Sequence, residues 1–158
     1  MRRRLLPAFA LALLMGMTLT PSVGNADLAA THRHKAFVRQ TVYEHFNVKA
    51  TETYIRHAYW QNRTQVWGNY YDEGYCYHSA YPGWNTAQCY YWLGDNIPNA
   101  VRINIVGEYH HAFGIDYQDR AWARSRANNE FAYSCGFDHA FNFPPDWWMD
   151  CNGGRYKA

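Results

Sequence analysis

The chain has 158 residues, of which 48% are hydrophobic, 18% aromatic and 18% charged. This length is typical of a single domain and excludes a large multidomain protein. The high hydrophobic and aromatic content excludes a disordered chain, because disorder requires low hydrophobicity and high net charge. Four cysteines are fewer than a disulfide-dense mini-protein carries, so a hydrophobic core must supply most of the folding free energy.

The first 26 residues are predicted to be a secretory signal peptide. Three arginines at positions 2–4 precede an apolar run over 5–19. Small residues, Gly24 and Ala26, occupy positions −3 and −1 relative to the expected cleavage site, as signal peptidases require. The run is shorter than the ~20 residues that a membrane-spanning helix needs. We therefore expect cleavage after Ala26, no membrane span after processing, and a secreted domain over 27–158 in the extracellular space, periplasm or cell envelope. The arginines also loosely resemble a twin-arginine export signal.

Removal of this segment makes the chain nearly neutral. The whole chain has 15 basic and 13 acidic residues, and the first 26 residues hold three arginines and no acid, so 12 basic residues remain against 13 acidic ones. A general basic footprint for nucleic acid is therefore absent. The chain also carries 14 tyrosines and 7 tryptophans. Because this exceeds the needs of a small core, some rings are expected at the surface, where they serve recognition.

Because exported proteins mature in an oxidising environment, the four cysteines are predicted to form two disulfides. Three pairings are possible, and we favour Cys76–Cys89 with Cys135–Cys151, because each bond closes a short local loop that contains turn-forming prolines. Each loop of this size stabilises by about 3 kcal/mol in the chain-entropy model. The crossed pairings remain open.

The predicted fold is α+β and mainly β. Residues 27–62 are expected to be helical, because Val38, Val42 and Phe46 recur at the spacing of one helix face. From about residue 65 to 151 the pattern is that of strands and turns. The expected strands are 65–71, 75–81, 88–93, 100–111, 120–126 and 130–137. Short connections favour an antiparallel meander or a small sandwich, with the helical segment packed on one side and a loose tail after Asn152.

Charged residues alternate along two neighbouring expected strands. A period of two places Glu108 and His110 on one face of the first strand, and Arg124 and Arg126 on one face of the second. Together these residue types suit metal-free cleavage of a phosphodiester, with Glu108 as base, His110 as acid and the arginines on the phosphate. The set is similar in residue types to the Glu/His/Arg sites that small secreted microbial ribonucleases carry on an antiparallel sheet. A shifted register, or ordinary cross-strand ion pairs, is the alternative.

Other chemistry is not indicated. No histidine spacing matches a known metal motif, no glycine-rich phosphate loop occurs, and no nucleophile motif is present, so neither a metal site nor a cofactor is predicted.

The leading interpretation is a binding module for a polysaccharide, a cell envelope component or a protein. Aromatic residues cluster beside both predicted disulfides, where rigid loops present rings at low entropy cost. Trp84, Tyr91 and Trp148 are the candidate contacts. A small secreted hydrolase of the nuclease type is the alternative, and only that alternative has nucleic acid as a partner. A third hypothesis is an enzyme inhibitor whose loop 76–89 enters a target's cleft.

Overall fold

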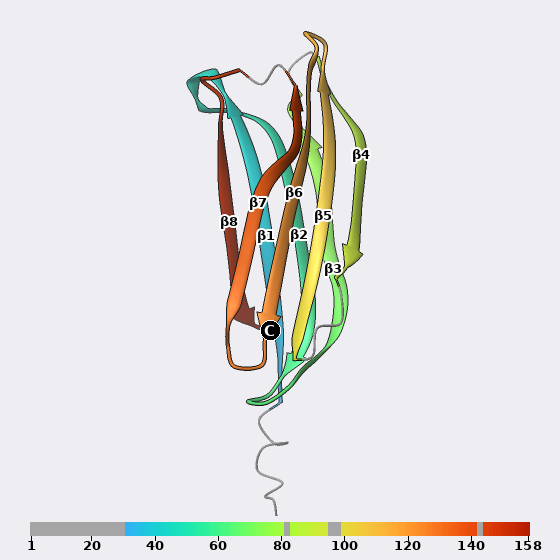
Figure 1. Cartoon of the computed structure of the whole chain (residues 1–158), viewed down its shortest axis with the longest axis vertical. Helices are drawn as coiled ribbons and strands as arrows, with labels where there is room; N and C mark the ends of the chain where they lie inside the picture. Colours follow the sequence, from blue (N-terminus) through green and yellow to red (C-terminus); the bar gives the residue numbers. More distant parts are fainter. Residues whose placement is uncertain (1–30, 81–82, 95–98, 142–143) are drawn as a thin grey trace, which may run out of the picture.

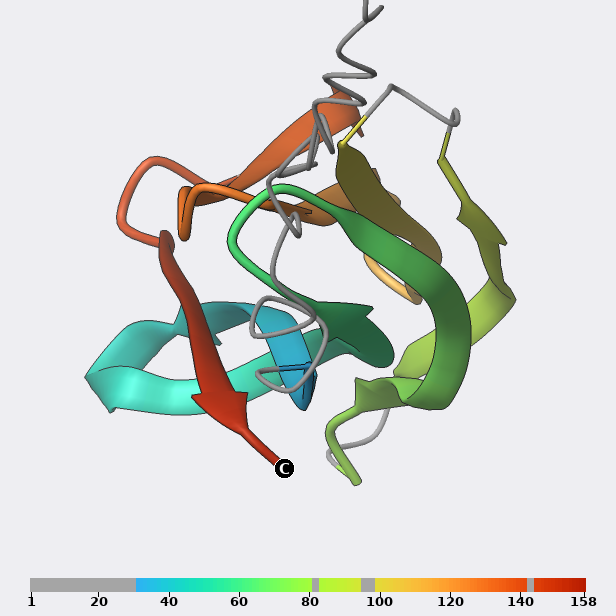
Figure 2. The same cartoon turned by 90° about the horizontal axis from the view of Figure 1, so that it is seen from below.

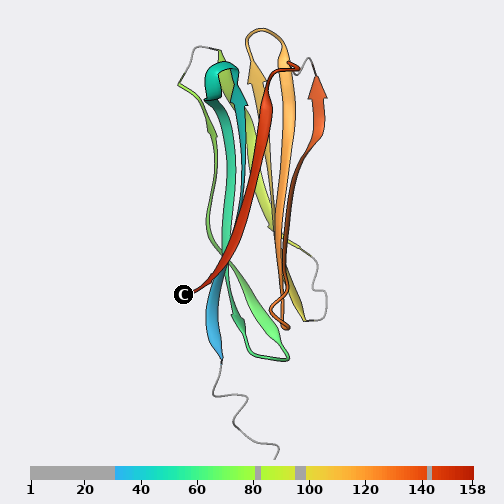
Figure 3. The same cartoon turned by 90° about the vertical axis from the view of Figure 1, so that its left-hand side faces the viewer.

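The computed structural model describes residues 31–80, 83–94, 99–141 and 144–158. These residues form two four-stranded antiparallel sheets, elongated along the strands (Figures 1 and 3). The elements are β1 (His32–Glu44), the 3-10 turn η2 (His45–Asn47), β2 (Val48–Gln61), β3 (Val66–His78), β4 (Trp84–Leu93), β5 (Ala100–His111), β6 (Ile115–Arg126), β7 (Phe131–Phe141) and β8 (Trp148–Lys157).

The two sheets pack face to face as a sandwich, which Figure 2 shows along the strand direction. Sheet A has the order β3-β2-β1-β8 and sheet B the order β4-β5-β6-β7. Strands that follow one another through short connections pair antiparallel within each sheet. β8 then returns to sheet A and pairs with β1. The expectation of a mainly β, antiparallel fold is therefore confirmed.

The helix expected over 27–62 is corrected within the described residues. Residues 32–61 form the β1–β2 hairpin, and the 3-10 turn η2 is its connection; residues 27–30 lie outside the described part of the chain. Val38 and Val42 do share a buried face, as the helical interpretation required. Residues i and i+4 share a face in a strand as well as in a helix, and pairing with β2 and β8 decides for the strand.

Three apolar clusters follow one another along the space between the sheets. One lies near the η2 end, one in the middle and one near the start of β1. Their buried members are Val42, Ala50, Trp84, Tyr109, Ile115, Tyr117 and Trp147; then Val38, Ile55, Ile103, Ile105, Ala121 and Ala123; then Ala36, Tyr59, Val66 and Val101. The alternating inward residues of β5 match the pattern read from the sequence.

A polar layer separates the first two clusters. Asp119 of β6 is fully buried, and Gln40 Nε2 donates to its Oδ1 at 2.7 Å. Thr53 Oγ1 lies 3.2 Å from the other carboxyl oxygen and 2.7 Å from the Tyr109 hydroxyl. Burial raises the pKa of Asp119 well above its usual value, although the Thr53 hydrogen bond opposes this rise. Burial in the interior therefore shifts the equilibrium of this carboxyl group toward its protonated form.

The disulfides are Cys76–Cys89 and Cys135–Cys151, as predicted. The first joins edge strand β3 of sheet A to edge strand β4 of sheet B, and the second joins edge strands β7 and β8 in the same way. Each open side of the sandwich is thus closed by one covalent link. The described residues contain no helix long and apolar enough to cross a membrane.

The tail after Asn152 is not loose, which corrects a further expectation. It belongs to β8. Aromatic rings pack directly against its glycines: a Cβ on Gly153 would lie 2.5 Å from the ring of Tyr133, and one on Gly154 would lie 2.8 Å from that of Phe37. Glycine therefore permits the close packing that orders this strand.

Candidate functional site

The outer face of sheet B carries aromatic rings and arginines side by side. Ile103 and Ile105 of β5 point into the core, so the alternate residues of β5 and their partners point outward. We call the surface that they form on β4, β5 and β6 the Trp–Arg face; it consists of Tyr90, Trp92, Arg102, Arg120, Trp122 and Arg124.

The register places these residues in neighbouring rows across the sheet. Trp92, Asn104 and Trp122 form one row, so the two indoles stand about two interstrand spacings, or ~10 Å, apart. Arg102 pairs directly opposite Arg124 in the adjacent row. Two arginines thus occupy facing positions on the outer face of sheet B.

Cation–π contacts fix the arginines on this face. The guanidinium carbons of Arg102 and Arg124 lie 4.6 and 5.7 Å from the ring centre of Trp122. That of Arg120 lies 6.0 Å from Trp92, within the range in which such contacts attract. Tyr90 stacks on Trp92 with ring centres 5.9 Å apart, and Trp92 keeps 39% of its surface exposed. The face therefore combines oriented positive charge with open ring surface.

The residues of the expected nuclease set are not all brought together. Glu108 and His110 share the outer face of β5, as expected, and pair with Gln118 and Asp116. Arg124, however, pairs with Arg102, and Arg102 lies six residues, or about 20 Å, along β5 from Glu108. Arg126 is farther from Glu108 than Arg124 is. The hairpin register, which the sequence left open, separates the arginines from the acid–base pair.

Glu108 and His110 instead line a small depression, which we call the side pocket. Its residues are Glu108, His110, Asp116, Tyr117, Gln118 and His139. Asp116 Oδ1 lies 2.6 Å from His110 Nδ1, and Gln118 Nε2 donates to Glu108 Oε1 at 2.6 Å. When Nδ1–H donates to Asp116, the His110 Nε2 atom is the one left to exchange a proton. No three of the described His, Cys, Asp and Glu side chains are placed to hold one metal ion.

The three candidate aromatic contacts lie in different places. Trp84 is only 7% exposed and packs in the core, which corrects its expected exposure. Tyr91 is exposed and stacks on Tyr71 of β3 across the sheet edge. Trp148 is exposed and stacks on Tyr43 at the opposite edge. The three residues therefore do not form one surface.

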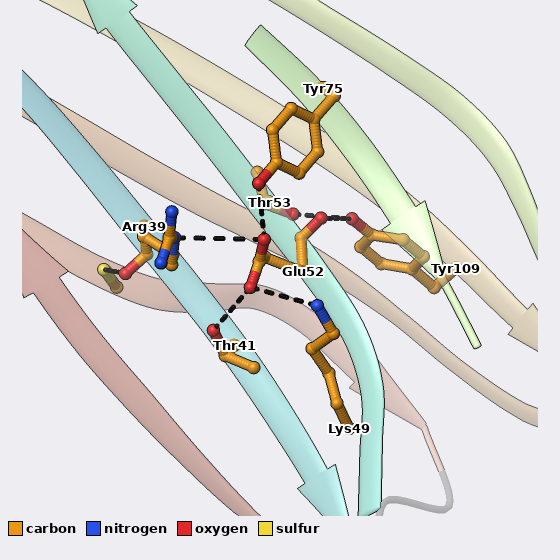
Figure 4. Close-up of polar contacts among 8 residues, drawn as sticks. Arg39, Thr41, Lys49, Glu52, Thr53, Tyr75 and Tyr109 are labelled. Carbon is orange, nitrogen blue, oxygen red and sulfur yellow. Dashed lines mark hydrogen bonds and ion pairs between the residues drawn. The ribbon is translucent and has the colours of Figure 1, made fainter.

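A cluster around Glu52 has the residue types of an acid–base site but no unused oxygen (Figure 4). Tyr75 donates to Oε1 at 2.6 Å, and Thr41 and Lys49 lie 3.3 and 3.4 Å from Oε2. Burial alone raises the pKa of Glu52, but the Tyr75 hydrogen bond and the charges of Lys49 and Arg39 outweigh burial and lower it. The cluster stabilises the outer face of sheet A.

A second cavity, of about 400 Å³, opens at the η2 end between the sheets. We call it the end pocket; it is lined by Glu44, His45, Trp84, His111, Phe113, Ile115, Pro144 and Trp147. The ring of Trp84 lies 4.8 Å from that of His111 and 5.5 Å from that of Trp147. Trp84, chosen from the sequence as a surface contact, is instead a buried wall of this pocket.

Comparisons with models of protein families, with curated proteins and with solved structures give no match.

Sequence reasoning missed Trp92, Trp122 and Arg102 as one site, and it missed the end pocket. The alternation of Arg120, Trp122 and Arg124 along one strand was the available signal for the first. Nothing local joins Glu44 to Trp84, because the end pocket is assembled from both sheets.

Proposed function

We propose that this protein is an exported, disulfide-stabilised binding module that holds an acidic polysaccharide on the Trp–Arg face. The observation that carries the proposal is the pair of arginines, Arg102 and Arg124, whose guanidiniums both lie against the ring of Trp122 on an outer sheet face. Guanidiniums that are oriented by ring contacts present planar sets of N–H donors, which match the geometry of a carboxylate group.

The rings beside the arginines favour a sugar chain as the carrier of that anion. Tyr90 and Trp92 offer a stacked, half-exposed platform along β4, and amphipathic rings of this kind contact the apolar faces of sugars. The local charge is limited, because Arg120 pairs with Asp138 at 2.6 Å and Arg126 with Glu130 at 2.9 Å. A nucleic-acid surface needs a broader basic field. Export itself is supported by the predicted signal peptide and by the two disulfides.

The test is binding of the disulfide-intact protein to polygalacturonate, to neutral dextran and to single-stranded oligonucleotides. We expect binding to polygalacturonate that weakens with salt, because screening reduces charge contacts. Arg124→Gln and Trp92→Ala should each weaken it about tenfold or more, a loss of roughly 1.4 kcal/mol or more.

Arg33→Gln and Trp148→Ala are the matched controls, because both residues are exposed on sheet A away from this face. Equal binding to dextran, or equal losses in the control variants, contradicts an acidic-glycan site. Preference for the oligonucleotides contradicts the choice of ligand.

A second candidate is a hydrolase that uses the side pocket. The His110–Asp116 pair and Glu108 line this pocket on the same sheet face, and Arg120 lies one outward position from Gln118. Glu108→Gln and His110→Ala should each abolish cleavage of RNA or of the bound polymer while the fold persists by circular dichroism. An inert wild-type protein rules this candidate out. The inhibitor hypothesis stays a prediction; residues 81–82 of its loop lie outside the described residues.

A further inference from the structure

Charged side chains are distributed unevenly along the length of the sandwich. We divide the molecule at the level of the middle apolar cluster, where Val38 pairs with Ile55. Toward the η2 end, acidic side chains outnumber basic ones among the described residues, and the arginines and lysines there are Arg39, Lys49 and Arg120. The half that holds the start of β1 has the opposite balance.

The described acidic side chains of that second half all take part in ion pairs. They are Asp72, Glu73 and Glu130, and their partners are Lys35, Arg56 and Arg126. The other described arginines and lysines of this half are Arg33, Arg63, Arg102, Arg124, Arg155 and Lys157. The half is therefore basic, and the molecule has a charge dipole along its strands.

The β2–β3 hairpin and the start of β1 extend beyond the turns of sheet B at the basic end (Figures 1 and 3). Arg63 is exposed in the hairpin turn, where Asn62 Oδ1 accepts hydrogen bonds from two backbone N–H groups at 2.9 and 2.7 Å. Arg33 is exposed near the start of β1. Lys157 reaches the same place, with its Nζ 3.3 Å from His32 Nε2. Three basic side chains thus lie at the protruding end.

Exposed aromatic rings lie directly beside these cations. Trp60 pairs with Arg33 on one side and with Trp67 on the other, in one row across the outer face of sheet A. Trp60, Trp67 and Tyr70 keep 38%, 40% and 57% of their surface exposed. A Cβ on Gly68, whose φ is +67°, would lie 2.7 Å from the Tyr70 ring and 3.2 Å from the Trp60 ring. These two rings therefore pack against the glycine backbone and still face solvent.

This combination matches the surface of an anionic lipid bilayer. Basic side chains are attracted to the negative potential of anionic head groups. Tryptophan and tyrosine favour the boundary between head groups and acyl chains, because each has an apolar ring and a polar group. The acidic half is repelled by the same potential, so the charge dipole favours an end-on approach.

We propose that this end of the sandwich, which we call the basic tip, docks on an anionic membrane surface. The basic tip consists of Arg33, Trp60, Arg63, Trp67, Tyr70 and Lys157. The cations contact lipid phosphates, and the rings enter the head-group layer without crossing the membrane. The tip shares no residue with the Trp–Arg face.

The test is co-sedimentation of the disulfide-intact protein with vesicles of phosphatidylcholine alone and of equimolar phosphatidylcholine and phosphatidylglycerol. We expect binding to the anionic vesicles that weakens with salt. Arg63→Gln should weaken it about fivefold, the loss expected when one basic residue is removed from an anionic surface. Trp67→Ala should weaken it by about fivefold or more, because the ring loses its place in the head-group layer.

Lys49→Gln and Trp148→Ala are the matched controls, because they make similar changes at exposed positions in the opposite half. Near-ultraviolet circular dichroism confirms that each variant is folded. Equal binding to both kinds of vesicle, no binding at low salt, or equal losses in the controls overturns the proposal.

Two rival partners of the basic tip give different results. If Arg63→Gln weakens binding to polygalacturonate or to oligonucleotides as much as binding to vesicles, the tip attracts polyanions in general and the proposal is wrong. If the wild type self-associates at low salt without vesicles, and Arg63→Gln abolishes this, the acidic end of a second copy is the partner instead. Loss of vesicle binding with intact binding to polygalacturonate leaves the proposed glycan site unaffected.

Discussion

Asp119 is the residue at which the interior departs most from an apolar sandwich core. Its side chain extends from β6 toward sheet A, and among the described residues it is hydrogen-bonded to Gln40 and Thr53, neither of which is basic. An ionised carboxylate without a counter-charge is costly in such a place, which is why its pKa rises. The hydrogen bonds fix its orientation.

The first prediction concerns Asp119→Asn, which mimics the protonated carboxyl. The raised folded-state pKa means that the native state keeps a proton which the unfolded chain releases above about pH 4. The wild-type free energy of unfolding should therefore fall, relative to that of the variant, as pH rises from 4 toward the folded-state pKa. Urea denaturation of both proteins between pH 4 and 8 measures this difference.

Burial lowers the pKa of His57 to about 4, so its contribution runs in the opposite direction and is lost as pH falls below 6.5. It is common to both proteins and cancels in the difference. A difference that stays flat across the range contradicts a protonated Asp119.

At the scale of single elements, β8 is a strand whose packing depends on two glycines. Gly153 and Gly154 weaken an isolated strand, but here they accept the rings of Tyr133 and Phe37 at distances that a Cβ forbids. β8 is therefore stabilised both by its backbone pairing with β1 and by the packing of these two rings against its glycines. The glycines that indicated a loose tail from the sequence are the residues that allow its packing.

Gly153→Ala is the second stability prediction. The new Cβ meets the Tyr133 ring, so that ring or the strand must move, and overpacking of this kind costs about 1–3 kcal/mol. Gly136→Ala on β7 is the matched control, since nothing lies within 4 Å of its Cβ position. Chemical denaturation should give free energies of unfolding that differ by at least about 1 kcal/mol between the two variants. Equal free energies of unfolding would contradict the prediction, because they would show that β8 accommodates the added Cβ without loss of stability.

The whole molecule is two sheets whose four edge strands are linked in two pairs. The loops that the disulfides close are short, with sequence separations of 13 and 16, yet each bond joins different sheets. Short loops and cross-sheet links coincide because the chain changes sheet between β3 and β4 and again between β7 and β8. The bonds therefore secure the sandwich at the two places where backbone pairing ends.

Replacing either cysteine pair by alanine should lower the free energy of unfolding by about 3 kcal/mol in the chain-entropy model. The two losses should be similar, because the loop lengths are similar. Denaturation curves of the two double variants measure the losses, and the intact mass of the natural product shows whether it begins at Asp27 with both bonds formed. A product with an uncut N-terminus and four free thiols would contradict the proposed export.

The sequence by itself determined the strand 100–111, whose alternation of Val101, Ile103 and Ile105 with polar residues is a local property of the backbone. It also favoured the cysteine pairing that the structure has, because each bond closes a short loop, but it left the crossed pairings open. Only the tertiary structure decided that residues 32–61 are strands, that Trp84 is interior and that Arg124 stands far from Glu108. These outcomes depend on register and on contact between sheets, which join residues distant in the chain, and local periodicity carries no information about such distant partners.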